Sequence, residues 1–184
     1  MSTKPLKKGA TYDDLCEVPD HFVAEIFDGE LYASPRPAVP HAHAASVLGT
    51  QLGGPFHRSG PGGWVILHEP ELHFGSDVLV PDLAGWRRTR MPRAPADAFI
   101  TLAPDWICEV LSKSTEALDR GKKLRIFARE GVAHAWFIDP LAHTLEVLAL
   151  ATGSWVELGR YEGQAKVRAA PFDALSLELG ALWI

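Results

Sequence analysis

The stretch that decides the fold is WICEVLS, residues 106–112. Five of its seven residues are apolar, and Glu109 stands in the middle. A short, almost continuous apolar run predicts a strand that is buried on both faces of a sheet. An ionised carboxylate in such a strand is costly unless it is paired, protonated or bound to a metal ion. Glu109 therefore requires an explanation beyond packing.

The elements around this strand predict a mixed sheet. A capping box at Thr11 and Asp14 predicts a short helix near 12–16, and Asp28-Gly29 predicts a tight hairpin after a strand at 23–28. The residues after this hairpin predict a helix at 41–52, which the breaker-rich GGPFHRSGPGG ends, then one long strand or two joined strands at 64–74 and a strand at 78–86 that Pro81 interrupts. A short strand FITL and the strand at 105–111 follow, and then a helix from Ser114 to about Glu130 that Gly131 stops. The last predicted elements are a strand at 133–139, a hairpin of 144–150 with 155–161, and a short strand and turn at 172–184. The central order of helix, strand, strand, strand, helix, strand predicts an α/β (mixed α+β) fold with helices on the faces of the sheet.

Composition predicts one soluble domain. The chain has 184 residues, which suits a single domain over 11–184 behind a loose leader at 1–10. The polar N-terminus and the absence of a long apolar run predict a cytoplasmic protein without a membrane segment. The two cysteines form no CxxC pair, so neither a disulfide framework nor a thiolate zinc site is expected.

Charge bears on a nucleic-acid partner in two ways. The net charge of −5 argues against coating of nucleic acid in bulk. GWRRTRMPR nevertheless gathers Arg87, Arg88, Arg90 and Arg93, which either contact a DNA backbone or form a solvated loop paired with the surplus acids.

A second carboxylate repeats the anomaly of Glu109. In VLVPDLAGW, Asp82 stands among apolar residues, and the two carboxylates converge if their strands are neighbours. Like charges that close require compensation, and Mg²⁺ often uses only one or two protein carboxylates. The alternatives are a turn-capping role for Asp82 and, for Glu109, a buried ion pair with Arg87 or Arg125.

A lysine on the following helix is a candidate third group. In ALDRGKKLRIFARE the expected buried stripe is Leu118, Gly121, Leu124 and Phe127/Ala128. Lys123 borders this stripe, so its stem can lie along the sheet and bring its ammonium to the carboxylates. The alternative is a solvated helix face.

Several of these motifs together resemble a known family. VPDLAGW, ICEVLSKST, DRGKKLRIFAREGVAHAWFIDP and the upstream FDGELYASPRPAVPH are similar to the Uma-type family of putative restriction endonucleases, within the PD-(D/E)XK nuclease superfamily. The resemblance covers about residues 11–184 and implies a restriction-endonuclease-like core with an N-terminal hairpin and extra C-terminal strands. Asp82 matches the Asp of PD, and Glu109 matches the acidic residue of (D/E)XK. Leu111 stands where the superfamily has its lysine, and Lys123 matches the helical lysine of the Uma-type family.

The resemblance implies a chemistry and a set of partners. It implies Mg²⁺-dependent hydrolysis of DNA phosphodiester bonds, with Mn²⁺ expected to substitute and no organic cofactor. The metal would be held by Asp82, Glu109 and the Val110 carbonyl, and Lys123 would stabilise charge in the reaction. His41 and Glu25 match family positions and are accessory candidates; their alternatives are a hydrogen-bonded core histidine and a solvent-facing strand residue. A homodimer is expected because duplex cleavage needs two active sites.

Two other functions fit the same residues. One is a catalytically silent nuclease fold that binds nucleic acid or protein. The other is a metal-dependent hydrolase of a different phosphate ester, which would keep the carboxylates but not need the arginine segment.

Overall fold

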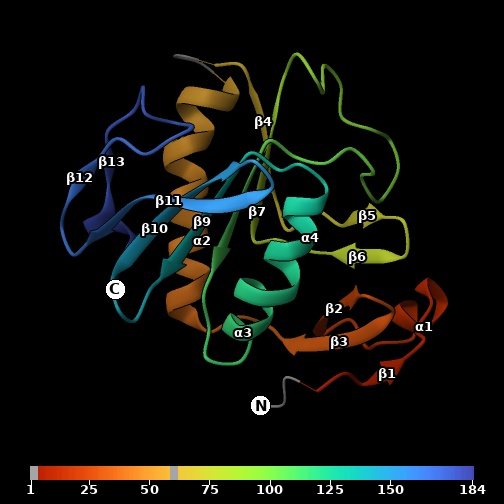
Figure 1. The fold of residues 1–184 in the computed structure, drawn as a ribbon. Helices are drawn as coiled ribbons and strands as arrows, with labels where there is room; N and C mark the ends of the chain where they lie inside the picture. The colour runs from red at the N-terminus through yellow and green to blue at the C-terminus, as the bar shows by residue number, and fades with distance from the viewer. Residues whose placement is uncertain (1–3, 59–61) are drawn as a thin grey trace.

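A six-stranded mixed sheet forms the centre of the computed structural model, which describes residues 4–58 and 62–184 (Figure 1). Its strands are β4 (Trp64–His68), β7 (Leu83–Arg87), β8 (Trp106–Val110), β9 (His134–Asp139), β10 (Thr144–Ala151) and β11 (Ser154–Glu162). Their spatial order is β11-β10-β9-β8-β7-β4; β8 and β9 are parallel, and the other neighbours are antiparallel. Every residue of β8 is buried, so the predicted mixed sheet and its buried central strand are confirmed.

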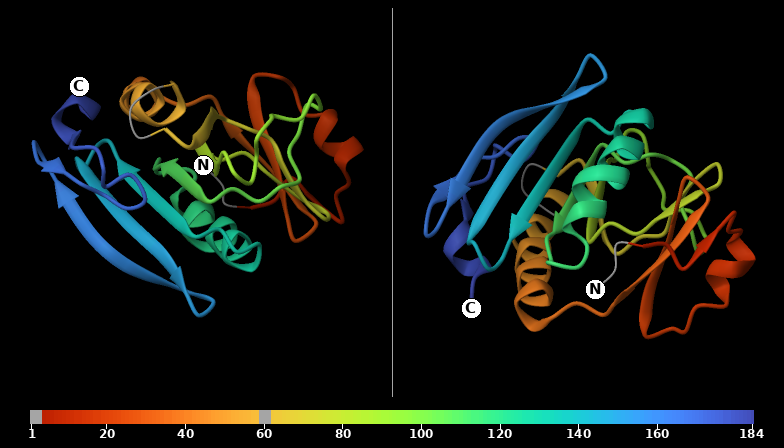
Figure 2. Two further views of the ribbon diagram at one scale, coloured as in Figure 1. Left: turned by 90° about the horizontal axis from the view of Figure 1, so that it is seen from above. Right: turned by 60° about the horizontal axis from the view of Figure 1, so that its bottom comes forward.

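Helices cover both faces of this sheet, as Figures 1 and 2 show. On one face α2 (Val39–Leu52) packs Ala44, Leu48 and Leu52 against a core that includes Trp106, Cys108 and Val110 of β8. The other face carries α3 (Glu116–Leu118), the π-helical turn η2 (Asp119–Lys123) and α4 (Leu124–Arg129). Ile107 and Leu111 point to that second core. The two-residue alternation of β8 therefore divides its side chains between two helical layers.

A smaller sheet lies beside the α4 face. Its strands are β1 (Lys7–Lys8), β2 (Phe22–Phe27), β3 (Glu30–Pro35), β5 (Leu72–Phe74) and β6 (Asp77–Leu79), in the order β1-β3-β2-β6-β5. The Asp28-Gly29 hairpin is confirmed, with φ values of 53° and 71°. So is the capping box of α1 (Tyr12–Cys16). Lys7 and Lys8 pair with β3, so the expectation of a loose leader is wrong for these residues. Residues 1–3 of the leader lie outside the described residues.

Two predicted strands prove to be split between the sheets. The run 64–74 forms β4 in the large sheet and β5 in the small one, and the run 78–86 forms β6 and β7 in the same way. Pro81 separates β6 from β7 because it cannot donate a ladder hydrogen bond. FITL makes a single bridge, from Ile100 to Leu72, rather than a strand. The crossing between sheets places Asp82 at the start of β7.

Both long helices depart from regular α geometry. The first starts at Val39 and continues as a π-helix, η1 (Gly53–Arg58), so the predicted breakers do not stop it at Gly53; residues 59–61 of that stretch lie outside the described residues. The second begins at Glu116 and carries η2 in its middle. Gly131, at φ 74°, ends it as predicted.

The C-terminal elements are short. The predicted hairpin of 144–150 with 155–161 is present as β10–β11 and turns at Thr152-Gly153. Beyond it lie β12 (Lys166–Val167), β13 (Leu177–Glu178) and the 3-10 helix η3 (Leu179–Leu182), which agree with the predicted short strand and turn. Phe172, from the same segment, packs against Trp64, Trp106 and Trp136 on the α2 side of the sheet. None of the described helices is long and apolar enough to span a bilayer.

Gly85 of β7 provides a test of this packing. A Cβ atom at residue 85 would lie 3.1 Å from the Trp106 ring and 3.3 Å from the Trp64 ring, and both rings are buried. We expect Gly85→Ala to lower the free energy of unfolding by about 1–3 kcal/mol, measured by urea denaturation. Gly53→Ala is the control: residue 53 has helical φ and open space around its Cβ, so its stability should stay equal or rise. Equal stabilities of Gly85→Ala and wild type would contradict this packing.

Candidate active site

Asp82 and Glu109 lie next to each other where β7 begins and β8 ends. The two strands are neighbours, which was the condition for the two carboxylates to converge, and the Leu83–Cys108 register extends to place Asp82 opposite Glu109. Asp82 Oδ2 accepts a hydrogen bond from the Val110 N–H at 2.7 Å, which fixes the carboxylate over the end of β8. Because the N–H and C=O of one strand residue face the same side, the Val110 carbonyl also faces Asp82. The three groups suggested for a metal therefore lie together where β7 begins and β8 ends.

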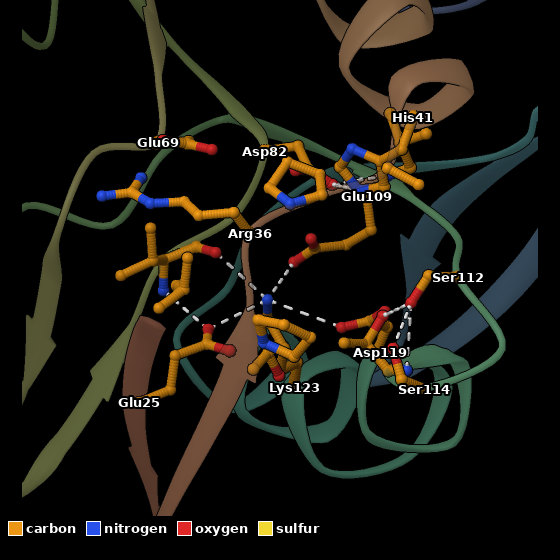
Figure 3. A pocket seen from close by; sticks show the side chains of 18 of the residues that line it. Glu25, Arg36, His41, Glu69, Asp82, Glu109, Ser112, Ser114, Asp119 and Lys123 are labelled. Carbon is orange, nitrogen blue, oxygen red and sulfur yellow. Dashed lines mark hydrogen bonds and ion pairs between the residues drawn. The ribbon is translucent and has the colours of Figure 1, made fainter. Parts of the chain in front are cut away.

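Lys123 is at the centre of the site (Figure 3). Its ammonium lies 2.8 Å from Glu109 Oε1, 3.0 Å from Glu25 Oε1 and 3.6 Å from Asp119 Oδ1. It also donates to the Val80 carbonyl at 3.2 Å. The Lys123 side chain is only 3% exposed, so it is buried rather than on a solvated helix face. The predicted approach of Lys123 to Glu109 is present, and the alternative pairing of Glu109 with Arg87 or Arg125 is not.

The π-helical turn η2 carries both Asp119 and Lys123, and both are buried. A wider turn changes which residues of a helix face the sheet. Instead of the expected stripe through Gly121 and Leu124, the buried residues are Leu118, Asp119, Lys123, Ile126 and Phe127. Asp119 and Lys123 both point inward from this turn. The stripe prediction was therefore wrong in detail, although it placed Lys123 on the correct side.

Leu111 shows why a helical lysine can reach Glu109. Residues 107, 109 and 111 of the β8 segment point to the α4 face, and Leu111 packs in the core on that face. A lysine at 111 would have extended along the same face toward Glu109. Lys123 approaches the carboxylate from the helix that covers this face. With leucine at residue 111, the ammonium beside Glu109 therefore comes from the helix and not from the strand.

Carboxylates outnumber ammonium groups in this cluster. Glu25, Glu109 and Asp119 lie against the single ammonium of Lys123, and a fourth carboxylate, Asp82, lies beside Glu109 with His41 as its partner. Burial raises the pKa of Glu109 well above its ordinary value, and the neighbouring carboxylates add to the rise against the effect of Lys123. Burial alone would lower the pKa of Lys123, but Glu109, Glu25 and Asp119 outweigh it and hold that pKa well above its usual range. The ammonium therefore stays charged, and the carboxylates compete for it.

The two accessory candidates also lie in the cluster. Glu25 of β2 is 8% exposed, accepts from the Val80 N–H at 2.8 Å and contacts Lys123, so its solvent-facing alternative is wrong. His41, in the first turn of α2, places Nε2 3.3 Å from Asp82 Oδ2. Burial disfavours its charged form, but Asp82 outweighs this and raises the pKa of His41.

The predicted arginine segment lies elsewhere. Arg87 ends β7 at the opposite end of that strand from Asp82, with its guanidinium 4.1 Å from the Trp64 ring centre. Arg88 donates to the carbonyls of His57 and Trp64, and Arg90 pairs with Asp105 at 2.8 Å. These contacts agree with an intramolecular role for three of the arginines. Contact of this segment, including Arg93, with DNA stays a prediction.

Asp119 and the Ser112 hydroxyl were not predicted from the sequence to be part of this pocket. Asp119 is 5% exposed and lies four residues before Lys123, a spacing that could have identified it. The Ser112 hydroxyl contacts those of Ser114 at 2.9 Å and Thr115 at 3.0 Å, and Thr115 in turn lowers the pKa of Asp119 by hydrogen bonding, against a larger effect of burial. Seryl and threonyl side chains before a helix resemble ordinary caps, so no separate sequence signal indicated this contact.

The donor set fits a hard divalent cation with few protein ligands. The described residues contain no group of three or more His, Cys, Asp or Glu side chains arranged to hold a metal. Mg²⁺ does not need one, because it commonly takes one or two carboxylates and keeps several waters. Glu109 Oε1 is a buried oxygen without a hydrogen bond of acceptable geometry, although the Lys123 ammonium is near. Asp82, Glu109 and the Val110 carbonyl thus form a suitable oxygen donor set.

Comparison with known proteins gives a consistent result. The family model Uma2, described as a putative restriction endonuclease, matches residues 10–180. The chain is also similar to the crystal structure of a putative nuclease belonging to DUF820 from Anabaena variabilis ATCC 29413, with a TM-score of 0.71 and 22% sequence identity. That match covers 94% of this chain and 97% of the other. It confirms the predicted restriction-endonuclease-like fold. No curated protein matches the chain.

Asp119 gives the cluster a measurable pH dependence. Burial raises the pKa of Asp119 from 3.8 to about 6, against the effect of Lys123. The folded state therefore holds a proton that the unfolded state releases, and the associated stability is lost as pH rises from about 4 to about 6. We expect the free energy of unfolding to fall by at least about 2–3 kcal/mol over this range. Asp119→Asn should reduce that fall, measured by urea denaturation, and leave the part that comes from Glu109, whose pKa burial also raises.

An exposed carboxylate provides the control. Asp173→Asn should keep the wild-type decline, because Asp173 is exposed and follows Phe172 on the α2 side of the sheet, away from Lys123. A decline of equal size in wild type and Asp119→Asn would show that Asp119 is not its source.

Proposed function

Because the chain belongs to the Uma2 family of putative restriction endonucleases, we propose that it is a Mg²⁺-dependent endonuclease that hydrolyses DNA phosphodiester bonds. The observation that carries this proposal is the convergence of Asp82 and Glu109, from adjacent strands, in one pocket with Lys123. A cut through both strands of a duplex needs two such pockets, so we infer that the chain acts on duplex DNA as a homodimer.

In the proposed reaction a water oxygen attacks phosphorus and the bond to the leaving oxygen breaks. The products are one phosphomonoester end and one hydroxyl end. Asp82, Glu109 and the Val110 carbonyl would hold Mg²⁺, which polarises the phosphate and lowers the pKa of water. Asp82 is preoriented for this by the Val110 N–H and by His41.

Lys123 is proposed to act on Glu109. Its ammonium already donates a hydrogen bond to the Val80 carbonyl and forms ion pairs with Glu25 and Glu109. In this arrangement it favours the ionised form of Glu109 against the cost of burial and holds the side chain in place. Stabilising the charge on phosphorus as well would require one of these partners to be exchanged for substrate.

A plasmid-nicking series tests this proposal. We expect wild-type protein with Mg²⁺ to convert supercoiled DNA to the open circular form, and EDTA to stop it. Asp82→Asn and Glu109→Gln should each lower the rate by at least about 100-fold, the scale at which loss of one electrostatic group in a site acts. Glu178→Gln, an exposed carboxylate outside the pocket, should cut at the wild-type rate.

The outcomes separate the alternatives. Nicking that persists in Glu109→Gln would show that the proposed site is wrong. Binding of DNA by wild type without any cut would favour the silent binding module. Hydrolysis of a simple phosphodiester without nicking would favour the other hydrolase.

Metal binding can be measured without activity. We expect calorimetric titration with Mn²⁺ to show one binding event in wild type and none in Asp82→Ala, because that carboxylate is a proposed ligand. Glu178→Gln should bind as wild type does. The absence of binding in wild type would contradict both metal-dependent functions.

A further inference from the structure

The pocket around Lys123 has an acidic floor and a basic rim. It has a volume of about 380 Å³ and is lined by residues from β2, the 34–38 segment, α2, the 80–82 crossing and the 109–123 segment. Its floor carries Glu25, Asp82, Glu109 and Asp119. Apart from the buried Lys123, Arg36 and Lys113 are the lysine and arginine side chains among its described lining residues. Neither took part in the mechanism proposed above.

Arg36 lies on a rigid wall of the pocket. Pro37 restricts the backbone of Arg36 to extended conformations, and the ring of Pro35 fixes φ at the residue before it. The exposed guanidinium donates one hydrogen bond, at 2.8 Å, to the Asp20 carbonyl. Arginine has five N–H donors, so most remain for a ligand. Figure 3 shows this side chain on the Glu69 side of the pocket.

Lys113 lies on the opposite wall. It is exposed between Ser112 and Ser114, whose hydroxyls bond to each other. The Thr115 hydroxyl and N–H also contact the Ser112 hydroxyl, so this short loop is held in one conformation. In Figure 3 Ser112 and Ser114 lie across the pocket from Arg36, with the Asp82 and Glu109 carboxylates between them.

We propose that Arg36 and Lys113 bind the phosphates on either side of the phosphodiester that is cut, on the same strand. This inference rests on the proposed function. A floor of four carboxylates repels a polyanion, so binding energy must come from cations at the rim. Two cations on opposite walls would hold the strand across the mouth and centre one phosphate above Asp82 and Glu109. Arg36 can make paired hydrogen bonds to a phosphate, and Lys113 acts as a point charge.

Salt-dependent binding tests this role independently of cleavage. A fluorescent 12-nucleotide single strand is titrated with full-length protein in EDTA at several salt concentrations. For single strands each phosphate contact contributes about 0.7 to the slope of log affinity against log salt, so Arg36→Ala/Lys113→Ala should reduce the slope by about 1.4. The Kd at low salt should rise at least about 10-fold.

A matched double variant controls for net charge. Arg125→Ala/Lys166→Ala removes one exposed arginine and one exposed lysine that are ion-paired outside the pocket, with Asp28 and Glu178. It should keep the wild-type slope. Equal slopes for the two double variants, or no binding by wild type, would overturn the assignment.

The same variants distinguish this inference from the proposed function. Binding with the expected loss of slope, but no nicking by wild type, would support the rim and reject the endonuclease. Nicking by wild type with an unchanged slope in Arg36→Ala/Lys113→Ala would support the endonuclease and reject the rim.

Discussion

The contact on which the rest of the structure depends is that of the Lys123 ammonium with Glu25, Glu109 and Asp119. It joins a strand of the small sheet, the central strand of the large sheet and the covering helix, and through the Val80 carbonyl it also holds the crossing between the sheets. Removing one partner of a buried ion pair costs about 3–5 kcal/mol, because the other charge is left without compensation. The cluster therefore fixes how the two sheets meet as well as the geometry of the pocket.

Stability alone does not account for such a cluster. Replacing a buried ion pair by apolar residues of similar volume is often neutral or stabilising. Here three carboxylates lie within 3.6 Å of one ammonium, a fourth, Asp82, lies beside Glu109, and burial raises the pKa of both Glu109 and Asp119 against the effect of Lys123. Strongly perturbed carboxyl groups in a pocket are typical of sites that bind or transform a ligand. A second cation would offset the excess of negative charge around Lys123, so the proposed metal site agrees with the electrostatics of the cluster.

The sequence was informative where local rules govern structure and less so where tertiary contacts do. The buried β8 strand, the Asp28-Gly29 hairpin and the stop at Gly131 follow from apolar patterning and backbone preference, and all are present. The division of 78–86 between two sheets could not be read from the strand pattern, because Pro81 only indicates an interruption. Asp119 was missed because the expected stripe ran through Gly121 and Leu124, although Asp119 lies four residues before Lys123 and pairs with it. The arginine segment was judged by its charge, while its position follows from the antiparallel pairing of β7 and β8.

The lysine absent at Leu111 shows that the chemistry of this site depends on position in space rather than on spacing in sequence. Glu109 and Leu111 point to the same face of β8, and the second helix covers that face. A long, flexible side chain can therefore reach Glu109 either along the strand or from the helix above it. Leu111 packs with Leu118 in the apolar core, while Lys123 brings the charge. Moving the cation to the helix thus leaves the end of β8 apolar, and it makes the approach of charge to Glu109 depend on the π-helical turn that carries Lys123.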